Sequence, residues 1–232
     1  KFADLASGSG HILNEGFDML YNLYVLEGYS RSQAIENIFR YNLTGVDIDT
    51  RAKQLAQFAL LLKACQKDSS FADAHIMPRV LDMPEPYPYK DNLRDTLPRF
   101  FLGGNQEMIQ EICDAIELMD QAKNLGSIMK FNISERTRNA IMIRMEEYEN
   151  ETHVPEAIHQ LMPYMSVILS LTEKYSALVM NPPYMKAANM NDALKIYVEE
   201  KYTMSRFDMY SVFMNVGMSS VKPNGTLSMI VQ

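Results

Sequence analysis

The N-terminal segment of the chain places a short apolar run, a glycine-rich turn and an amphipathic helix in immediate succession. Residues 2–5 are mostly apolar, Gly8 and Gly10 follow, and apolar residues then recur close to the 3.6-residue helical period. These apolar positions are Ile12, Leu13, Phe17, Leu20, Tyr21, Tyr24 and Val25. Glycine tolerates positive φ and lets the backbone approach a ligand closely, although the turn can also need glycines for its geometry alone. The pattern predicts strand, turn and helix, and favours an α/β fold.

A second strand and helix follow the first pair. Residues 43–49 are predicted to form a strand with acids at its carboxyl end, and residues 51–66 a helix with Thr50 as its N-cap. An acid at this position is well placed to bind both hydroxyls of a ribose, with Asp47 the better candidate and Asp49 in reserve. Such acids can also serve only the helix N-terminus, where the helix dipole favours negative charge.

Further apolar runs extend the alternation of strands and helices. Residues 78–82 form a candidate third strand that ends in an acid, residues 176–180 a fourth, and the run that ends at Val231 lies within the expected fifth. This doubly wound pattern predicts a parallel sheet with the strand order 3-2-1-4-5. The expected fold class is therefore α/β, with a Rossmann-like core.

Three polar residues fall at the carboxyl ends of these predicted strands. They are Asp4, Asp47 and Asn181. Ligands of doubly wound sheets bind outside the carboxyl ends of the strands, at the point where the strand order reverses. One cleft is therefore expected to hold all three residues, with Asp4 able to accept a hydrogen bond from a ligand ammonium group.

The fourth strand runs directly into Asn181-Pro182-Pro183-Tyr184. Proline has no N–H and a fixed φ, and the residue before it is held extended, so two consecutive prolines form a rigid corner without donors. The Asn181 side-chain oxygen and the Pro182 carbonyl can then both accept from one NH₂ group, which directs its nitrogen lone pair out of the ring plane. Tyr184 offers a face on which an aromatic base can stack. This geometry suits methylation of a planar amine, although a strand followed by a Pro-rich turn is the simpler interpretation.

The glycine-rich turn does not match two common nucleotide-binding motifs. No Gly-Lys-Ser/Thr follows it, so it is not a Walker loop. Gly8-x-Gly10 lacks the third glycine of the dinucleotide fingerprint, since position 13 is Leu. A nicotinamide-dependent oxidoreductase is therefore a poor candidate, and it would leave the Asn-Pro-Pro-Tyr corner unexplained.

Several motifs, in this order, resemble those of N6-adenine-specific DNA methyltransferases. Asp4–Leu13 looks like their S-adenosylmethionine loop, Gly45–Asp49 resembles their ribose-binding strand end, and Asn181–Tyr184 matches their catalytic motif. Asp208–Phe213 and Val221–Val231 are similar to the helix and strand that follow. The chain looks most like the large single-polypeptide methyltransferases of restriction and phage-defence systems, the BREX type in particular.

The loop departs from the family pattern at two positions. The family usually has Pro after its first acid and often Cys before its first glycine, whereas this chain has Leu5 and Ser7. Neither side chain is required for the backbone contacts that the loop makes, so the departures leave the resemblance in place.

The resemblance implies S-adenosylmethionine as the cofactor and adenine in DNA as the methyl acceptor, with no metal. Asp4 would receive the cofactor ammonium group, Asp47 its ribose, and Phe213 would flank the catalytic pocket. For the cofactor adenine, Asp82 and the segment Asn124–Ser127 remain alternatives. The cofactor-binding residues implied in this way are Asp4, Ala6, Ser7, Gly8, Ser9, Gly10, Asp47, Ile48, Asp82 and Phe213. The catalytic residues are Asn181, Pro182, Pro183 and Tyr184.

Other functions are compatible with the same tetrapeptide. It also serves methylation of a glutamine amide in proteins and of a guanine amino group in RNA. From a different class, the chain could be a cofactor-binding scaffold subunit that does not turn over. A panel of substrates tested with labelled cofactor separates these alternatives.

Composition narrows the class of protein. At 232 residues and 47% hydrophobic, the chain can bury one substantial core. It has no uninterrupted apolar stretch of about 18 residues, so no membrane span is expected. Cys65 and Cys113 have neither CxxC nor Cys/His spacing, which argues against a zinc site and a disulfide framework and fits a reducing cytoplasm.

The net charge of −7 argues against duplex binding by this chain alone, because DNA affinity depends largely on Lys and Arg that neutralise phosphates. In the methyltransferase interpretation, most DNA contacts would come from a target-recognition region outside this chain. Other proteins of a defence system are further expected partners.

The expected organisation is a core of residues 1–83 and 176–232 with a helical insertion at residues 84–175. The insertion is expected to include a helix over about residues 155–174, bent at Pro163. It would pack against the core or, alternatively, contact DNA or a partner protein. Because the chain opens at the first strand and closes within the fifth, we expect it to be a fragment of a larger protein.

Overall fold

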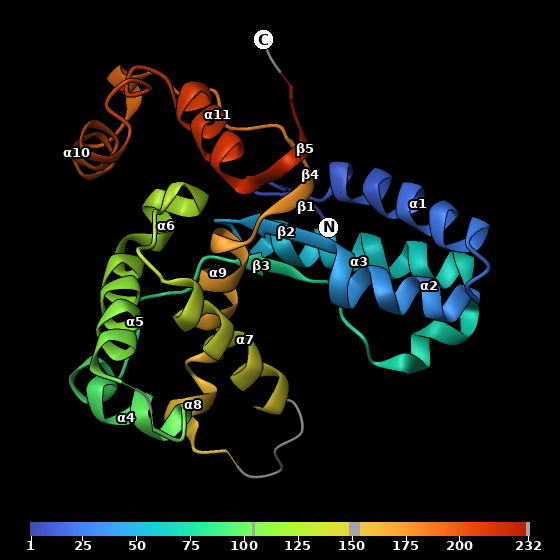
Figure 1. Ribbon diagram of the computed structural model, residues 1–232. Helices are drawn as coiled ribbons and strands as arrows, with labels where there is room; N and C mark the ends of the chain where they lie inside the picture. Colours follow the sequence, from blue (N-terminus) through green and yellow to red (C-terminus); the bar gives the residue numbers. More distant parts are fainter. Residues whose placement is uncertain (104, 149–153, 231–232) are drawn as a thin grey trace. The chain divides into compact units, whose positions relative to one another are not determined.

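The computed structural model describes residues 1–103, 105–148 and 154–230. Val231, in the run expected to lie within the fifth strand, lies outside these ranges. The chain separates into two compact units, residues 1–82 with 174–232 and residues 83–173. The strands of the described chain all belong to the first of these units (Figure 1).

The first unit is built on a five-stranded parallel sheet with the order β3-β2-β1-β4-β5. The doubly wound order predicted from the sequence is thus confirmed, and the neighbouring strands are visible in Figure 1. The strands are β1 (Phe2–Asp4), β2 (Leu43–Asp47), β3 (Val80–Asp82), β4 (Tyr175–Met180) and β5 (Val221–Met229).

Helices cover both faces of this sheet. Ala177 and Val179 of β4 pack against the apolar cluster on the α1 side, whereas a Cβ built on Gly217 of α11 would lie 3.2 Å from the Met180 side chain. Alternate residues of a strand point to opposite faces, so α1 and α11 lie on opposite sides of β4. The helices of this unit are α1 (His11–Leu26), α2 (Arg31–Asn37), η1 (Ile38–Asn42), α3 (Thr50–Lys67), η2 (Ser69–Ala74), η6 (Ala187–Asn189), α10 (Asp192–Lys201) and α11 (Met209–Ser220).

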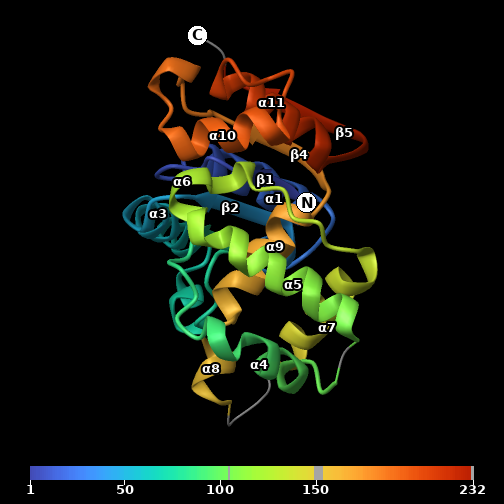
Figure 2. The ribbon, with the colours of Figure 1, turned by 90° about the vertical axis from the view of Figure 1, so that its left-hand side faces the viewer.

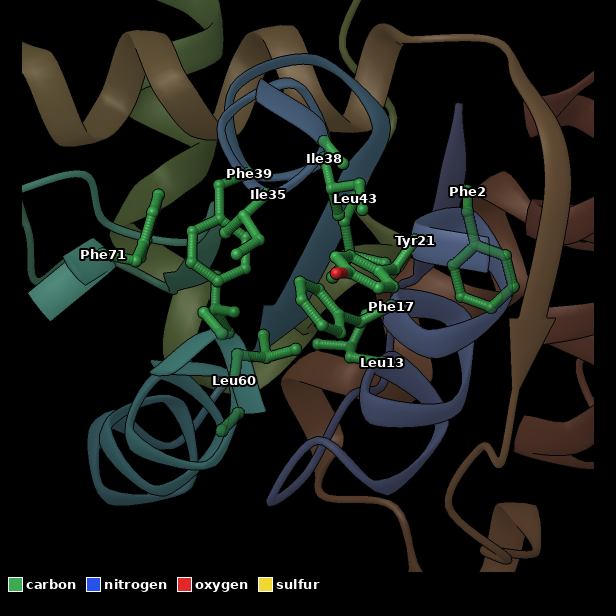
Figure 3. Packing of buried hydrophobic residues seen from close by; sticks show 14 residues of the cluster. Phe2, Leu13, Phe17, Tyr21, Ile35, Ile38, Phe39, Leu43, Leu60 and Phe71 are labelled. Carbon is green, nitrogen blue, oxygen red and sulfur yellow. The ribbon is translucent and has the colours of Figure 1, made fainter. Parts of the chain in front are cut away.

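An aromatic cluster forms the core between the sheet and the first three helices (Figure 3). The rings of Phe17 and Phe39 lie 5.7 Å apart, and Phe39 meets Phe71 edge-to-face at 5.6 Å. Each fully buried side chain of this size stabilises the fold by about 1.5–3 kcal/mol. The residues labelled in Figure 3 are Phe2, Leu13, Phe17, Tyr21, Ile35, Ile38, Phe39, Leu43, Leu60 and Phe71. This core fixes α1 and α3, and with them the turn that follows β1.

The N-cap of α3 is Asp49, so the prediction of Thr50 was wrong. The Asp49 carboxylate accepts from the backbone N–H of Arg51 at 2.7 Å and of Ala52 at 3.4 Å. Thr50 is the first helical residue, and its hydroxyl donates to Asp82 at 2.5 Å. Asp is the stronger N-cap of the two residue types, which agrees with its position here.

The described residues of the second unit form helices and connecting loops, with no strand among them. The predicted helix bent at Pro163 is instead two helices, because Pro163 lies in the first turn of the second, where a missing N–H removes no hydrogen bond. The elements are η3 (Lys90–Asn92), α4 (Leu93–Phe100), α5 (Gln106–Leu118), η4 (Met119–Gln121), α6 (Ala122–Leu125), η5 (Gly126–Ile128), α7 (Glu135–Tyr148), α8 (Glu156–His159) and α9 (Met162–Thr172). Figure 2 shows this unit from a second direction.

Across the ranges that the structure describes, no helix combines the length and apolar character needed to cross a membrane.

Candidate functional site

Strand register brings the predicted site residues of the first unit to one edge of the sheet. Asp4 pairs with Gly45, so that β2 extends beyond β1 as far as Asp47. Asp47 in turn lies beside Asp82, the last residue of β3. Asn181 directly follows β4, which pairs with the other side of β1. The carboxyl edge on both sides of β1 therefore carries polar side chains.

Backbone hydrogen bonds fix the loop that follows β1. One Asp4 carboxylate oxygen accepts from the Ala6 N–H at 2.9 Å. The Ser7 N–H donates to the Val46 carbonyl at 3.0 Å, and the Gly10 N–H donates to the Ser7 carbonyl at 2.8 Å. Gly10 has a φ of +85°, in the left-handed region that favours glycine. The loop is thereby tied to β2 before α1 begins.

Asp47 connects this loop to the end of β2. Its Oδ2 accepts from the Gly8 N–H at 2.8 Å and its Oδ1 from the Asp49 N–H at 2.9 Å. A carboxylate oxygen has a second lone pair, so both oxygens can still accept from a ligand hydroxyl. The next residue, Ile48, is 49% exposed, and a Cβ built on Gly8 would meet nothing within 4 Å. An acid, an exposed apolar side chain and open backbone thus lie together, a set that fits a nucleoside.

Asp4 is a buried acid at the tip of β1, only 1% exposed. Burial raises the pKa of its carboxyl to about 7, with the nearby charge of Asp47 adding to the rise and the Ala6 N–H opposing it. A carboxyl with a pKa near 7 can change its protonation state around neutral pH. A cation placed beside Asp4 would favour the ionised form.

Asp82 accepts hydrogen bonds from two side chains of α3, and the sequence did not predict either partner. Lys53 donates to Asp82 Oδ1 at 2.7 Å and Thr50 to Oδ2 at 2.5 Å. Burial alone would raise the pKa of Asp82, but these hydrogen bonds and the Lys53 charge hold it below its usual range. Thr50 and Lys53 are three residues apart, which places them on one face of the first helical turn. This spacing was the sequence pattern that could have indicated a shared partner.

The other candidate for contacting the cofactor adenine, Asn124–Ser127, belongs to the second unit. Asn124 lies in α6, and Ser127 lies buried in η5.

The Asn-Pro-Pro-Tyr segment leaves β4 with its polar groups outward. Asn181 is exposed, Pro182 is buried and Tyr184 is 44% exposed. The Tyr184 hydroxyl lies within hydrogen-bond distance of Asn181 Oδ1, at 3.2 Å, and of the Ile230 carbonyl, at 3.1 Å. The contact with Ile230, just beyond β5, was not anticipated from the sequence.

Phe213 lies buried in α11, the helix that precedes β5. The start of this helix is tied to the segment after Tyr184: the Met209 N–H donates to the Met185 carbonyl at 2.8 Å, and the Ala187 N–H to the Phe207 carbonyl at 3.0 Å. The structure thus connects the Asn-Pro-Pro-Tyr segment to the helix that carries Phe213.

A parallel 3-2-1-4-5 sheet whose carboxyl edge carries a glycine loop, an acid and Asn-Pro-Pro-Tyr is a Rossmann-like methyltransferase core. The chain belongs to the Eco57I restriction-modification methylase family, whose family model matches residues 41–232.

Two curated relatives carry closely related names. The chain is similar to the adenine-specific methyltransferase PglX of Lacticaseibacillus casei (strain Zhang), with 34% identity over 100% of this chain and 19% of the relative. It is also similar to the adenine-specific methyltransferase BrxX of Escherichia coli O9:H4 (strain HS), with 30% identity over 97% of this chain and 20% of the relative. The chain thus spans about a fifth of the length of each relative.

Proposed function

We propose that this chain carries the cofactor-binding and catalytic centre of an enzyme that transfers a methyl group from S-adenosylmethionine to the N6 amino group of adenine in DNA. The observation that carries the proposal is Asn-Pro-Pro-Tyr at the end of β4, on the sheet edge that also holds the Gly8 loop and Asp47. Membership of a restriction-modification methylase family and relatives named adenine-specific methyltransferase support it.

The residues at the edge suit S-adenosylmethionine, which supplies an electrophilic methyl group when bound. Asp4 would hold its ammonium group and Asp47 its ribose hydroxyls. Ile48 would lie against its adenine, with Asp82 as the polar contact. The backbone of residues 6–10 would lie along the cofactor, and Phe213 would flank the catalytic pocket.

The Asn-Pro-Pro-Tyr corner would orient the target amine. Asn181 Oδ1 and the Pro182 carbonyl accept the two amino hydrogens, which directs the nitrogen lone pair at the methyl carbon. The nitrogen would take the methyl group as the bond of that group to sulfur breaks, and the extra proton on nitrogen would leave to solvent. No side chain needs to form a covalent bond, so acceleration comes from positioning and electrostatics.

The substrate base must leave the duplex to reach this corner, at a cost of a few kcal/mol. Stacking on the exposed face of Tyr184 would offset part of that cost, at about 1–3 kcal/mol per base. Because this chain carries a net charge of −7, the phosphate contacts would come mainly from other parts of the full-length protein.

A substrate panel tests the proposal. The full-length protein would be incubated with methyl-labelled S-adenosylmethionine and, separately, unmodified duplex DNA, RNA and glutamine-containing protein. We expect label only in DNA, identified as N6-methyladenine by nucleoside mass spectrometry. Label in RNA guanine or in glutamine would assign a different acceptor, and cofactor binding without any label would indicate a scaffold.

Cofactor affinity is expected to depend on pH through Asp4. Below a pKa of about 7 the carboxyl is protonated and attracts an ammonium group weakly, so binding must first release that proton. Affinity should therefore rise by up to about tenfold per pH unit between pH 5 and 7 and then level off. The cofactor's own α-amino group, with an ordinary pKa of about 7.7–8.0, stays protonated over this window.

Calorimetry between pH 5 and 8 measures this dependence. Asp4→Asn should bind the cofactor more weakly at pH 7 and lose the slope. His11→Gln, which removes the exposed imidazole at the start of α1, should keep it. A slope that survives in Asp4→Asn would show that the proton belongs to another group.

A further inference from the structure

The Tyr184 hydroxyl joins the ends of β4 and β5. It lies 3.2 Å from Asn181 Oδ1 and 3.1 Å from the Ile230 carbonyl oxygen. The Ile230 N–H in turn donates to the Met180 carbonyl at 3.0 Å, which continues the pairing of the two strands shown in Figure 1. The Tyr184 phenolic oxygen therefore links the Asn-Pro-Pro-Tyr segment to the end of the neighbouring strand β5.

A hydroxyl has one hydrogen to donate and two lone pairs that accept. It cannot donate fully to both oxygens at once. The Ile230 carbonyl can only accept, whereas the Asn181 amide has an oxygen that accepts and a nitrogen that donates. The Ile230 carbonyl therefore has the stronger requirement for the hydroxyl hydrogen.

A 180° rotation of the Asn181 side-chain amide removes the competition of the two oxygens for the one hydroxyl hydrogen. Nδ2 then takes the place of Oδ1 and donates to the Tyr184 oxygen, while the hydroxyl donates to Ile230. Each hydrogen in this chain of bonds has its own acceptor. In this arrangement Asn181 Oδ1 points away from Tyr184, free to accept from a substrate.

The orientation of this amide matters for the proposed function, on which the inference rests. A target amino group presents two hydrogens and needs an oxygen at Asn181. The opposite orientation would set the amide NH₂ against the substrate NH₂, and two donors cannot pair. We propose that the Tyr184 hydroxyl, held by the Ile230 carbonyl, selects the reactive orientation of the Asn181 amide, so that Tyr184 is a positioning residue as well as a stacking surface.

This role is specific to asparagine at position 181. A carboxylate has two equivalent oxygens, and half a turn leaves it unchanged, so Asn181→Asp has no orientation to select. The Tyr184 hydroxyl should therefore matter in the wild-type protein and matter little in the Asn181→Asp background. A hydroxyl that only stabilises the fold would matter equally in both.

A double-mutant cycle in the full-length protein tests this. Tyr184→Phe keeps the ring, and we expect kcat for adenine methylation to fall about tenfold, equivalent to about 1.4 kcal/mol. The KM for DNA and the affinity for the cofactor should stay within about twofold, since stacking and the cofactor cleft are unchanged. In Asn181→Asp, adding Tyr184→Phe should change kcat by less than about twofold. Tyr41→Phe, which removes the hydroxyl of a tyrosine in η1 that is 62% exposed, is the matched control and should leave kcat unaltered.

Two outcomes overturn the inference while leaving the proposed function intact. One is a Tyr184→Phe enzyme with a wild-type kcat, and the other is an equal loss in both backgrounds. If Asn181→Asp is too slow to measure, the kcat and KM of Tyr184→Phe decide alone, and a change in KM without a change in kcat rejects the role. A wild-type protein that methylates no adenine overturns the proposed function itself, and the inference with it.

Discussion

Replacing Asn181 with Ala is expected to lower adenine methylation by at least about 100-fold while leaving S-adenosylmethionine binding unchanged. The side-chain oxygen is proposed to accept one amino hydrogen as the nitrogen attacks, and losing one preorganised polar contact to a reacting group typically costs about 10²–10³ in kcat. The residues proposed to hold the cofactor's ammonium group and ribose, Asp4 and Asp47, end β1 and β2, whereas Asn181 follows β4, so the two functions should separate. Single-turnover methylation and calorimetry measure them independently.

The control is Asn189→Ala, which truncates another exposed asparagine in η6. It should retain wild-type transfer. An Asn181→Ala protein that is folded, binds cofactor and methylates at the wild-type rate would remove Asn181 from the mechanism. A parallel loss of cofactor binding would instead indicate that the residue supports the cleft as a whole.

The fold was predictable because its main signals are local. The glycine turn after β1, the acids after β2 and the prolines after β4 each mark the carboxyl end of a strand, and the doubly wound order followed from their sequence. The full extent of β5 was less predictable. Its first half contains Pro223 and Gly225, which are ordinary turn residues, and it pairs with β4 through a register shift.

The edge of the sheet on which candidate residues lie could be predicted, but their partners could not. Topology alone sends Asp4, Asp47 and Asn181 to the carboxyl edge. By contrast, the hydrogen bond of Lys53 to Asp82 depends on how α3 packs against β3. The hydrogen bond of Tyr184 to the Ile230 carbonyl depends on the register of β5. Such contacts join residues far apart in sequence, so no local sequence pattern predicts them.

Replacing Gly10 with Ala is expected to destabilise the first unit by about 2–5 kcal/mol. Its φ of +85° costs an L-residue about 1–2 kcal/mol. The added Cβ would also lie 2.7 Å from the Ala56 Cβ and 3.0 Å from its Cα, so the backbone of α3 itself must shift. Crowding of this kind typically costs about 1–3 kcal/mol.

Gly28→Ala separates the two contributions. Gly28 has a φ of +87°, nearly the same as Gly10, but a Cβ there would meet nothing within 4 Å. It should therefore show only the backbone strain of about 1–2 kcal/mol. Thermal unfolding of both variants, with hydrogen exchange followed in α1 and α3, measures the difference. Equal losses would show that the close approach of α3 imposes no constraint. A larger loss in Gly10→Ala, with faster exchange at the start of both helices, would show that the loop glycine holds α1 against α3 and thereby fixes the loop proposed to bind the cofactor.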